Sequence, residues 1–359
     1  MMDTLEQALR EGACGISLGL MYEPGIFAPK EELLAVARLV KKYDRILTVH
    51  PKAMSNISLS YGTITKSHLM LALAELEDIV RETGVRFQYS HLLFIGKRTW
   101  PDEPKALAVL DGLTKDGFDV GFDMYPLHYG ASIITVVLPE WYMKLSPAAR
   151  KKPLNRFKLW VMIKLTTMLL GFGFPDITIA YAGEEHPEMM GKTISQLAQQ
   201  WGCSDFAAYV RACEESNYTA KVLQGKYQNR DIVKRLMQNK LSLYMTDAWV
   251  EPAGKQNGGI YGAFPMFLEI AQEMGYPLEK AIAKMSGKTA KRYQLADRGE
   301  LRTGAFADIN LIDLKKLQSR IEEELPPLGI QHVFMNGKQV IRDETYVGGE
   351  GDGAAVAIG

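Results

Sequence analysis

Apolar and polar residues alternate in the first third of the chain with the period of a helix and then with that of a buried strand. Between residues 30 and 42, apolar side chains recur every three or four positions, acidic residues occupy the first turn and lysines the last. This pattern predicts a helix. The segment that follows, 46–50, is apolar and β-branched, which is typical of a strand in a parallel sheet. The two patterns together indicate a helix that covers a buried strand.

The same pairing recurs along the chain. Helical patterns cover 69–84 and 103–115, and Gly84 is a typical helix end. Five segments have the pattern of buried strands: 15–20, 46–50, 85–91, 119–125 and 241–247. Alternating strands and helices predict an α/β fold with a parallel sheet, and a closed TIM-like (β/α)8 barrel needs eight strands. We therefore expect a partial barrel, or three strands that the pattern does not reveal.

Residues 126–240 interrupt this order. They contain an aromatic stretch with a proline, a basic patch at 150–152, and helical patterns near 193–214 and 230–239. Residues 155–170 fit a basic amphipathic helix, and a solvated helix with one buried face is the interpretation we favour. We interpret the whole segment as an insertion over one mouth of the barrel.

The chain ends in a different pattern. A helix is predicted at 278–293, and after Gly299 only short strands follow, at 308–311, 331–335 and 338–341. Asn336 and Gly337 predict a two-residue hairpin turn between the last two. We expect a barrel over 1–298 that includes the insertion at 126–240, a β-sandwich portion over 299–347 and a flexible tail over 348–359.

Composition narrows the class of protein. The 42 basic side chains balance the 42 acidic ones, which argues against a general binder of nucleic acid or of anionic membranes. The most apolar stretch, 165–175, is too short to span a bilayer, and no N-terminal signal is visible. Three cysteines in so long a chain form no disulfide framework. We therefore expect a soluble, cytoplasmic protein.

Three predicted strands end in a residue suited to metal binding or acid–base chemistry, namely His50, His91 and Asp247. In parallel α/β folds the carboxyl ends of the strands line the active-site mouth. Imidazole nitrogens and carboxylate oxygens bind Zn²⁺, and zinc-bound water becomes a nucleophile near neutral pH. Each residue alone is more simply explained as a polar strand cap, but three at equivalent positions favour a functional site.

Residues 12–25 (GACGISLGLMYEPG) resemble a characteristic segment of the N-acyl-D-amino-acid deacylase (D-aminoacylase) family of the amidohydrolase superfamily. Later motifs are similar to those of the family and follow in the same order: TVH at 48–50, SHL at 90–92, DMYP at 123–126, TD at 246–247, YGAFP at 261–265, ADRG at 296–299 and GAFADI at 304–309. The resemblance runs from about residue 3 to about residue 345. It implies a metal-dependent amidohydrolase barrel with a small β-sandwich portion.

The resemblance also implies roles for single residues. His50 and His91 match the two histidines that bind the family's zinc. Asp247 matches the aspartate that takes a proton from the metal-bound water and passes it to the leaving amine. Tyr125 lies in a stretch beside the substrate pocket. Lys52 stands where the family has an arginine, so it keeps the charge for a substrate carboxylate but lacks the planar fork.

The sequence also departs from the family. The His-x-His pair of the first barrel strand and the cysteine that completes the zinc site have no counterpart, and the resemblance implies that both would lie upstream of Met1. The family's His-Pro-Arg appears as Asn257-Gly258-Gly259. The clamp for the substrate is therefore expected to be altered.

Two functions remain open at this point. The first is a zinc-dependent hydrolase of N-acyl (D-)amino acids or similar linear amides, with cyclic amides or dipeptides as a variant substrate. The second is a catalytically incompetent fragment or pseudoenzyme, because two histidines and one carboxylate are few ligands for zinc. An incomplete barrel would expose strand edges, which predicts a homo-oligomer or a partner chain supplying the first strands. Neither nucleic acid nor a membrane is an expected partner.

Overall fold

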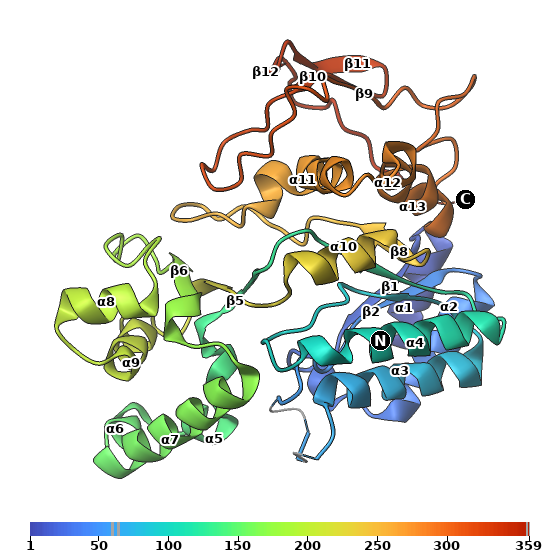
Figure 1. Cartoon of the computed structure of the whole chain (residues 1–359). Coiled ribbons are helices and arrows are strands. Elements are labelled where there is room, and N and C mark those ends of the chain that lie inside the picture. Colours follow the sequence, from blue (N-terminus) through green and yellow to red (C-terminus); the bar gives the residue numbers. More distant parts are fainter. Residues whose placement is uncertain (59–60, 63–64, 357, 359) are drawn as a thin grey trace.

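The computed structural model describes residues 1–58, 61–62, 65–356 and 358. Figure 1 shows three regions: a parallel sheet with its helices, a mostly helical region set to one side, and a small sheet at the C-terminal end. The first and third regions lie on opposite sides of the helices α11 (Gly259–Glu273), α12 (Leu278–Met285) and α13 (Gly287–Arg292).

The five strands predicted for the barrel form one parallel sheet in the order β1-β2-β3-β4-β8. Their bounds are β1 (Gly15–Gly19), β2 (Ile46–His50), β3 (Arg86–Tyr89), β4 (Val120–Met124) and β8 (Ser242–Tyr244). β1 and β8 are the edges, so the sheet is open across the part of the chain that the structure describes. This is the partial barrel that the strand count predicted.

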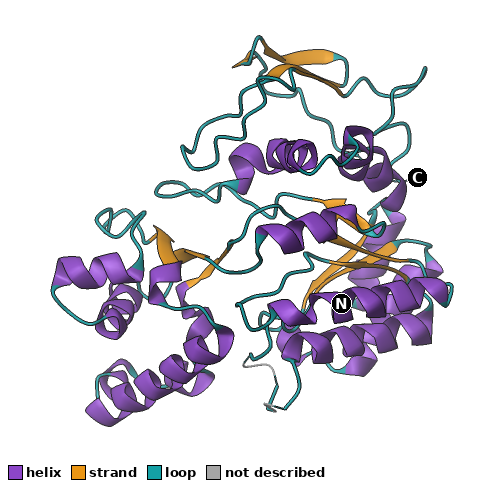
Figure 2. Cartoon of the chain, in the orientation of Figure 1, coloured by secondary structure: helices purple, strands orange, loops and turns teal. Residues whose placement is uncertain are grey.

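Helices flank this sheet (Figure 2), as the alternating pattern predicted. They are α1 (Met2–Arg10), α2 (Lys30–Lys42), α3 (His68–Thr83), α4 (Glu103–Lys115) and α10 (Arg230–Gln238). α3 ends at Gly84, which adopts the left-handed conformation at φ 61°, as a C-terminal glycine commonly does. The apolar faces of these helices and the strands share one hydrophobic core. α10 contributes to that core, although its sequence falls within the expected insertion.

The inserted region is built around a second hydrophobic core, which also includes Met54, Leu93 and Ile95 from the segments that follow β2 and β3. Its helices are α5 (Glu140–Met143), α6 (Pro147–Arg150), α7 (Pro153–Leu170), α8 (Ile194–Trp201) and α9 (Asp205–Glu215). It also contains an antiparallel sheet, in the order β5-β7-β6, formed by β5 (Gly130–Ile133), β6 (Ile177–Tyr181) and β7 (Lys221–Gln224). The sequence did not predict this sheet, because its short strands lack a clear period and are separated by helices.

Two helices predicted as continuous are broken. The segment predicted at 193–214 is divided between α8 and α9, because Gly202 takes the left-handed conformation at φ 62° and closes α8. The segment predicted at 278–293 is divided between α12 and α13 at Ser286, whose φ and ψ of −137° and −99° are not helical. In both cases the apolar spacing continues across the break, so the pattern alone did not reveal it.

The C-terminal sheet is antiparallel, in the order β12-β11-β10-β9. Its strands are β9 (Ile309–Ile312), β10 (Ile330–Met335), β11 (Lys338–Arg342) and β12 (Thr345–Tyr346). Asn336 and Gly337 form the predicted hairpin turn, both with positive φ (51° and 84°). The predicted flexible tail includes residues 357 and 359, which lie outside the described residues; within it, Asp352 pairs with Lys338.

None of the helices that the structure describes combines the length and the apolar character needed to cross a membrane.

Candidate functional site

The carboxyl ends of three parallel strands hold the residues singled out in the sequence. His50 is the last residue of β2, His91 lies two positions after β3, and Asp247 lies three positions after β8. In a parallel sheet these ends meet at one edge, where ligands bind in α/β folds. The topology therefore gathers these residues on the same side of the sheet.

His50 and His91 are in direct contact. Their ring centroids are 4.4 Å apart and the ring planes are inclined at 83°, so the edge of one imidazole meets the face of the other. The pairing follows from the neighbouring positions of β2 and β3 in the sheet. The two rings form the centre of the candidate site.

The imidazole of His50 has different surroundings at its two nitrogens. Nδ1 lies 3.1 Å from the carbonyl oxygen of Pro51, a geometry in which a protonated Nδ1 donates to that oxygen. Nε2 then carries the lone pair, and the hydroxyl of Tyr22 lies 3.5 Å from it. Burial and the neighbouring His91 lower the pKa of His50 to about 4, so the ring is neutral at pH 7.

His91 is buried and its backbone is held in an uncommon conformation, with φ of 37°. Its backbone N–H donates to the carboxylate Oδ1 of Asp123 at 2.6 Å. Its Nδ1 is buried without a hydrogen-bond partner, and burial lowers the pKa of the ring to about 4. A neutral imidazole with an unpaired buried nitrogen is suited to bind a metal ion or a substrate group.

Asp123, on β4, belongs to a chain of hydrogen bonds that continues through Gln88 to Arg292. Its Oδ2 accepts a hydrogen bond from Gln88 at 3.3 Å, and Oε1 of Gln88 accepts one from Arg292 at 3.0 Å. Arg292 also forms an ion pair with Asp119. Burial raises the pKa of Asp123 to about 6, opposed by the hydrogen bonds from His91 and Gln88. This chain fixes the backbone on which His91 stands.

Asp247 also has a left-handed backbone, with φ of 46°. Strained non-glycine residues of this kind concentrate at functional sites. The side-chain amide of Asn257 donates to the backbone carbonyl of Asp247 at 3.0 Å, and Oδ1 of Asn257 accepts from Gly259 at 3.0 Å. Burial raises the pKa of the Asp247 carboxyl, and His50 opposes this shift.

Glycine at position 259 allows the segment 257–259 to lie close to the end of β8. A Cβ on Gly259 would lie 2.7 Å from the carbonyl oxygen of Thr246, closer than real contacts permit. The segment 257–259 can therefore reach the end of β8 only with glycine at this position. The structure thus connects the altered sequence at 257–259 with the placement of Asp247.

Lys52 and Tyr125 were expected to face the substrate. The ammonium group of Lys52 is 3.1 Å from a carboxylate oxygen of Glu75 on α3. Tyr125 is buried, its hydroxyl has no hydrogen-bond partner, and burial followed by the charge of Asp247 raises its pKa well above the ordinary value. An unpaired buried hydroxyl near Asp247 is suited to contact a bound ligand.

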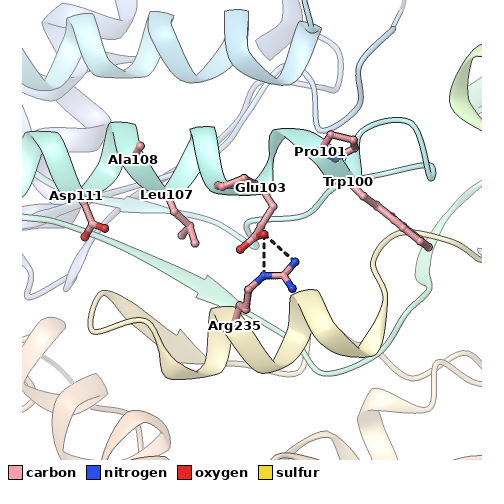
Figure 3. Close-up of a pocket in the computed structure, with 8 residues that line it drawn as sticks. Trp100, Pro101, Glu103, Leu107, Ala108, Asp111 and Arg235 are labelled. Atoms are coloured by element: carbon pink, nitrogen blue, oxygen red, sulfur yellow. Dashed lines mark hydrogen bonds and ion pairs between the residues drawn. The ribbon is translucent and has the colours of Figure 1, made fainter.

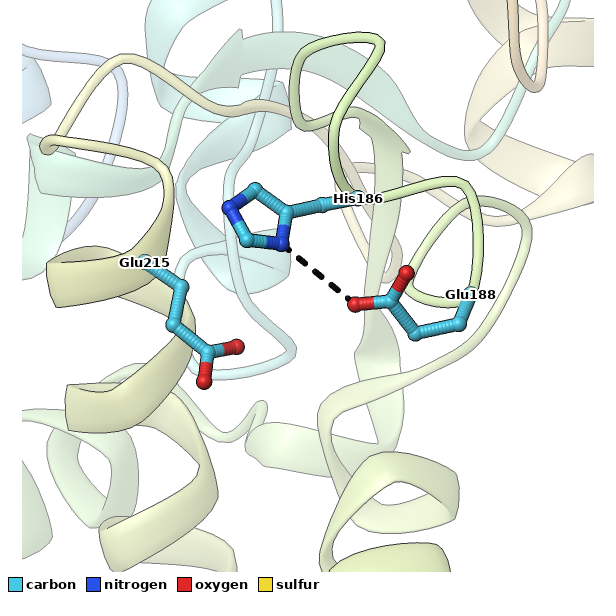
Figure 4. Close-up of side chains that lie close together, drawn as sticks. All are labelled: His186, Glu188 and Glu215. Carbon is cyan, nitrogen blue, oxygen red and sulfur yellow. Dashed lines mark ion pairs between the residues drawn. The ribbon is translucent and has the colours of Figure 1, made fainter.

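The donor set fits part of a metal site. His50 and His91 offer two neutral imidazoles in contact, one of them with an orphan nitrogen. Their ligand atoms and those of Asp247 do not all lie within 4.8 Å of one another. Across the described residues, that criterion is met by one group of three, His186, Glu188 and Glu215, in the inserted region (Figure 4). Glu188 is exposed, and exposed acidic clusters are common without a metal.

Two surface hollows lie outside this site. One, of about 620 Å³, lies between α4 and α10 and contains the ion pair of Glu103 with Arg235 (2.8 Å), as Figure 3 shows. The other, of about 280 Å³, is lined by residues that include Pro126 and His128. Neither is lined by His50, His91 or Asp247. The residues that line these two hollows include no pair of histidines, so the strand ends with His50 and His91 are the better candidate for the functional site.

The sequence did not identify three residues of this site as functional: Tyr22, Asp123 and Asn257. Asp123 could have been recognised from the sequence, because a carboxylate within an otherwise apolar strand must have a partner. Tyr22 and Asn257 are on loops, and their contacts with His50 and Asp247 arise only when distant segments meet.

Comparison with known proteins places this geometry in a family context. The Amidohydrolase family model matches residues 189–340. N-acyl-D-glutamate deacylase of Alcaligenes xylosoxydans xylosoxydans is 27% identical over 93% of this chain and 59% of its own length. D-aminoacylase of the same organism is 25% identical over 97% of this chain and 62% of its own length. The chain therefore spans about three fifths of the length of these curated relatives.

Solved structures agree with the sequence comparison. N-acyl-D-glutamate deacylase of Bordetella bronchiseptica, in complex with zinc and a phosphonate that mimics the tetrahedral intermediate, has a TM-score of 0.74 and 26% identity over 94% of this chain and 62% of its own. A D-aminoacylase structure has the same TM-score at 23% identity, over 97% of this chain and 64% of its own, and supports the partial TIM-like fold. By sequence motifs, relatives and fold, this chain is similar to the N-acyl-D-amino-acid deacylase (D-aminoacylase) family of the amidohydrolase superfamily.

Proposed function

We propose that this protein hydrolyses the amide bond of N-acyl-D-amino acids or similar linear amides, with a zinc ion as cofactor. The observation that carries the proposal is the contact of two neutral imidazoles, His50 and His91, at the strand ends where Asp247 also lies. The family relationship supports the same reaction class, since its relatives are deacylases of N-acyl-D-glutamate and of other D-amino acids.

His50 and His91 would hold the metal in this proposal. Nε2 of His50 would carry the lone pair because Nδ1 faces the Pro51 carbonyl, and a metal ion would replace its contact of 3.5 Å with the Tyr22 hydroxyl. Nδ1 of His91 is buried without a partner. When bound, zinc supplies a Lewis acid and lowers the pKa of water toward neutrality. Zinc in catalytic sites commonly has three protein ligands, so a further ligand is required beyond these two.

Asp247 is the proposed proton carrier. Its carboxylate would accept a proton as water attacks the amide carbon and would return it to the nitrogen of the leaving amine. Burial raises the pKa of this carboxyl, which suits a group that must both accept and release a proton. The hydrogen bond from Asn257 to the carbonyl oxygen of Asp247 helps to hold the backbone that carries this carboxyl group.

Lys52 and Tyr125 are the proposed substrate contacts. Lys52 would hold the carboxylate of the amino acid, exchanging its ion pair with Glu75 for one with the substrate. Tyr125 would donate its unpaired buried hydroxyl to a substrate oxygen. We also propose a cytoplasmic location, which the free thiols of Cys14, Cys203 and Cys213 favour.

The test combines metal content with turnover. The wild-type protein, supplied with zinc, is expected to bind about one zinc per chain and to release D-amino acids from a panel of N-acetyl-D-amino acids. The double variant His50→Ala/His91→Ala should lose the zinc. Asp247→Asn should keep the zinc and lose turnover by about a hundredfold or more. Absence of zinc from the wild-type protein would contradict the proposal.

A second candidate is a protein that is inactive until another chain completes the barrel. It is favoured by the open sheet, whose edge strands β1 and β8 each have one neighbour within the described residues. Unpaired strand edges favour association with other chains. A homo-oligomer or a complementing chain with the remaining barrel strands would satisfy them. This candidate predicts weak zinc binding and no turnover by the isolated chain.

A further inference from the structure

α7 in the inserted region has two apolar faces on opposite sides. One contains Leu159, Ile163 and Leu170, which are buried in the core of the insertion. The other faces outward and consists of Leu154, Phe157, Val161, Leu165 and Met168. These five recur every three or four residues, so they form one stripe along the helix. A solvated helix with a single buried face, as the sequence predicted, has no such second stripe.

Four of the five residues of the outward stripe are exposed, and Val161 is half-buried. The exposed fractions are 77% for Leu154, 61% for Phe157, 49% for Leu165 and 57% for Met168. Scattered apolar residues are normal on a surface, but a contiguous set on one helix face marks an interaction site. Figure 1 shows α7 beside α5 and α6 in the inserted region. The C-terminal end of α7 contacts the loops after β2 and β3, since Asn56 donates a hydrogen bond to the carbonyl oxygen of Leu169 at 3.3 Å.

Basic residues surround the stripe. Residues 150–170 contain six basic residues and no acidic one. Lys158 and Lys164 lie beside the stripe, with their ammonium groups 4.2 Å from the ring centre of Trp141 and 4.9 Å from that of Trp160. Two carboxylates on neighbouring helices are engaged in ion pairs, since Glu214 pairs with Arg156 and Glu140 with Lys144. The protein is neutral as a whole, but this face is cationic.

The charges around the stripe indicate which kind of partner can bind to it. A second copy of α7 would bring lysines against lysines, with no acidic residue on either helix to compensate. An anionic lipid surface matches both features, because apolar side chains enter the acyl boundary while the lysines reach the headgroups. Phe157 and Trp160 stack with ring centroids 5.8 Å apart, and aromatic rings are favoured at that boundary.

We propose that α7 docks this protein on the surface of anionic membranes, with the stripe Leu154, Phe157, Val161, Leu165 and Met168 as the inserted face. The helix lies in the plane of the interface and does not cross the bilayer. This proposal does not rest on the chemistry at His50 and His91, since none of the five stripe residues has a role in it.

The experiment is co-sedimentation of the full chain with vesicles of phosphatidylcholine alone and of phosphatidylcholine with phosphatidylserine. The wild type should bind the anionic vesicles and lose that binding as salt rises. Phe157→Ser/Met168→Ser should bind at least tenfold more weakly, and Lys158→Gln/Lys164→Gln roughly tenfold more weakly. Leu301→Ser, at a residue 83% exposed elsewhere, is the matched control and should bind as the wild type does.

Two results would overturn the proposal. One is the absence of binding to anionic vesicles, or binding that the α7 variants retain. The other is concentration-dependent dimerisation in light scattering that Phe157→Ser/Met168→Ser abolishes, with no vesicle binding by the wild type; the stripe would then be a contact between copies. Circular dichroism of each variant establishes that the fold is kept.

Discussion

The imidazole rings of His50 and His91 meet edge to face, with centroids 4.4 Å apart, although α3 separates the two residues in sequence. The contact exists because β2 and β3 are adjacent parallel strands and each histidine lies at a carboxyl end. Both rings are buried enough to be neutral at pH 7.

Stability of the metal-free protein should fall as the pH is lowered from 6.5 toward 4. The pKa of each histidine is about 4 when folded, below the ordinary value of 6.5, so the unfolded chain binds more protons in that interval. Each histidine then removes roughly 1.4 kcal/mol of stability per pH unit. Urea unfolding with a chelator present, at several pH values, measures this slope.

The double variant His50→Gln/His91→Gln is the control for that slope. Asp123 acts in the opposite direction, because its raised pKa of about 6 makes the folded state bind more protons between 3.8 and 6. Its contribution is common to both proteins and cancels in the difference. A wild-type slope equal to that of the double variant would mean that the two rings are not buried as neutral groups.

Asp123→Asn should weaken zinc binding by tenfold to a hundredfold, as loss of a residue that orients a metal ligand does. The carboxylate accepts hydrogen bonds from the backbone of His91 and from Gln88, and an amide cannot accept both through two oxygens. Zinc titration by calorimetry measures the effect. Asp116→Asn, at an exposed aspartate paired with Arg81, should leave the affinity unchanged.

Asn257→Ala should reduce turnover more than zinc affinity. The substitution removes the hydrogen bond from Asn257 to the backbone carbonyl of Asp247 and the one that Asn257 accepts from Gly259, and it should cost about 1–3 kcal/mol of stability because the side chain is buried. Asn257→Asp keeps the acceptor for Gly259 and loses the donor to Asp247, so an intermediate loss of kcat is expected. Equal losses of zinc and of turnover in both variants would assign Asn257 a purely structural role.

Lys52→Met should raise KM for substrates with a free carboxylate by about tenfold to a hundredfold, because a charge-assisted contact is lost. The kcat should change little. Glu75→Gln removes the carboxylate that pairs with Lys52 and should lower KM or leave it unchanged. If both variants alter only the midpoint of thermal unfolding, the ion pair is structural and Lys52 does not bind the substrate.

Much of the architecture is determined locally. The helix at 30–42 appears with the predicted bounds, and all five predicted barrel strands join one sheet. The hairpin at Asn336 and Gly337 forms as expected. These elements could be predicted because each depends on the spacing of apolar residues and on turn residues with a backbone preference.

The tertiary structure decided which residues that are far apart in the sequence come into contact. Three contacts depend on which strands and loops become neighbours. They are the ring contact of His50 with His91, the hydrogen bond from His91 to Asp123, and the hydrogen bond from Asn257 to Asp247. The sheet β5-β7-β6 joins strands that helices separate, and the outward stripe of α7 is defined only once the other face is buried. The sequence therefore determined the elements and the candidate chemistry, whereas packing decided which side chains meet, because a contact between distant segments leaves no period along the chain.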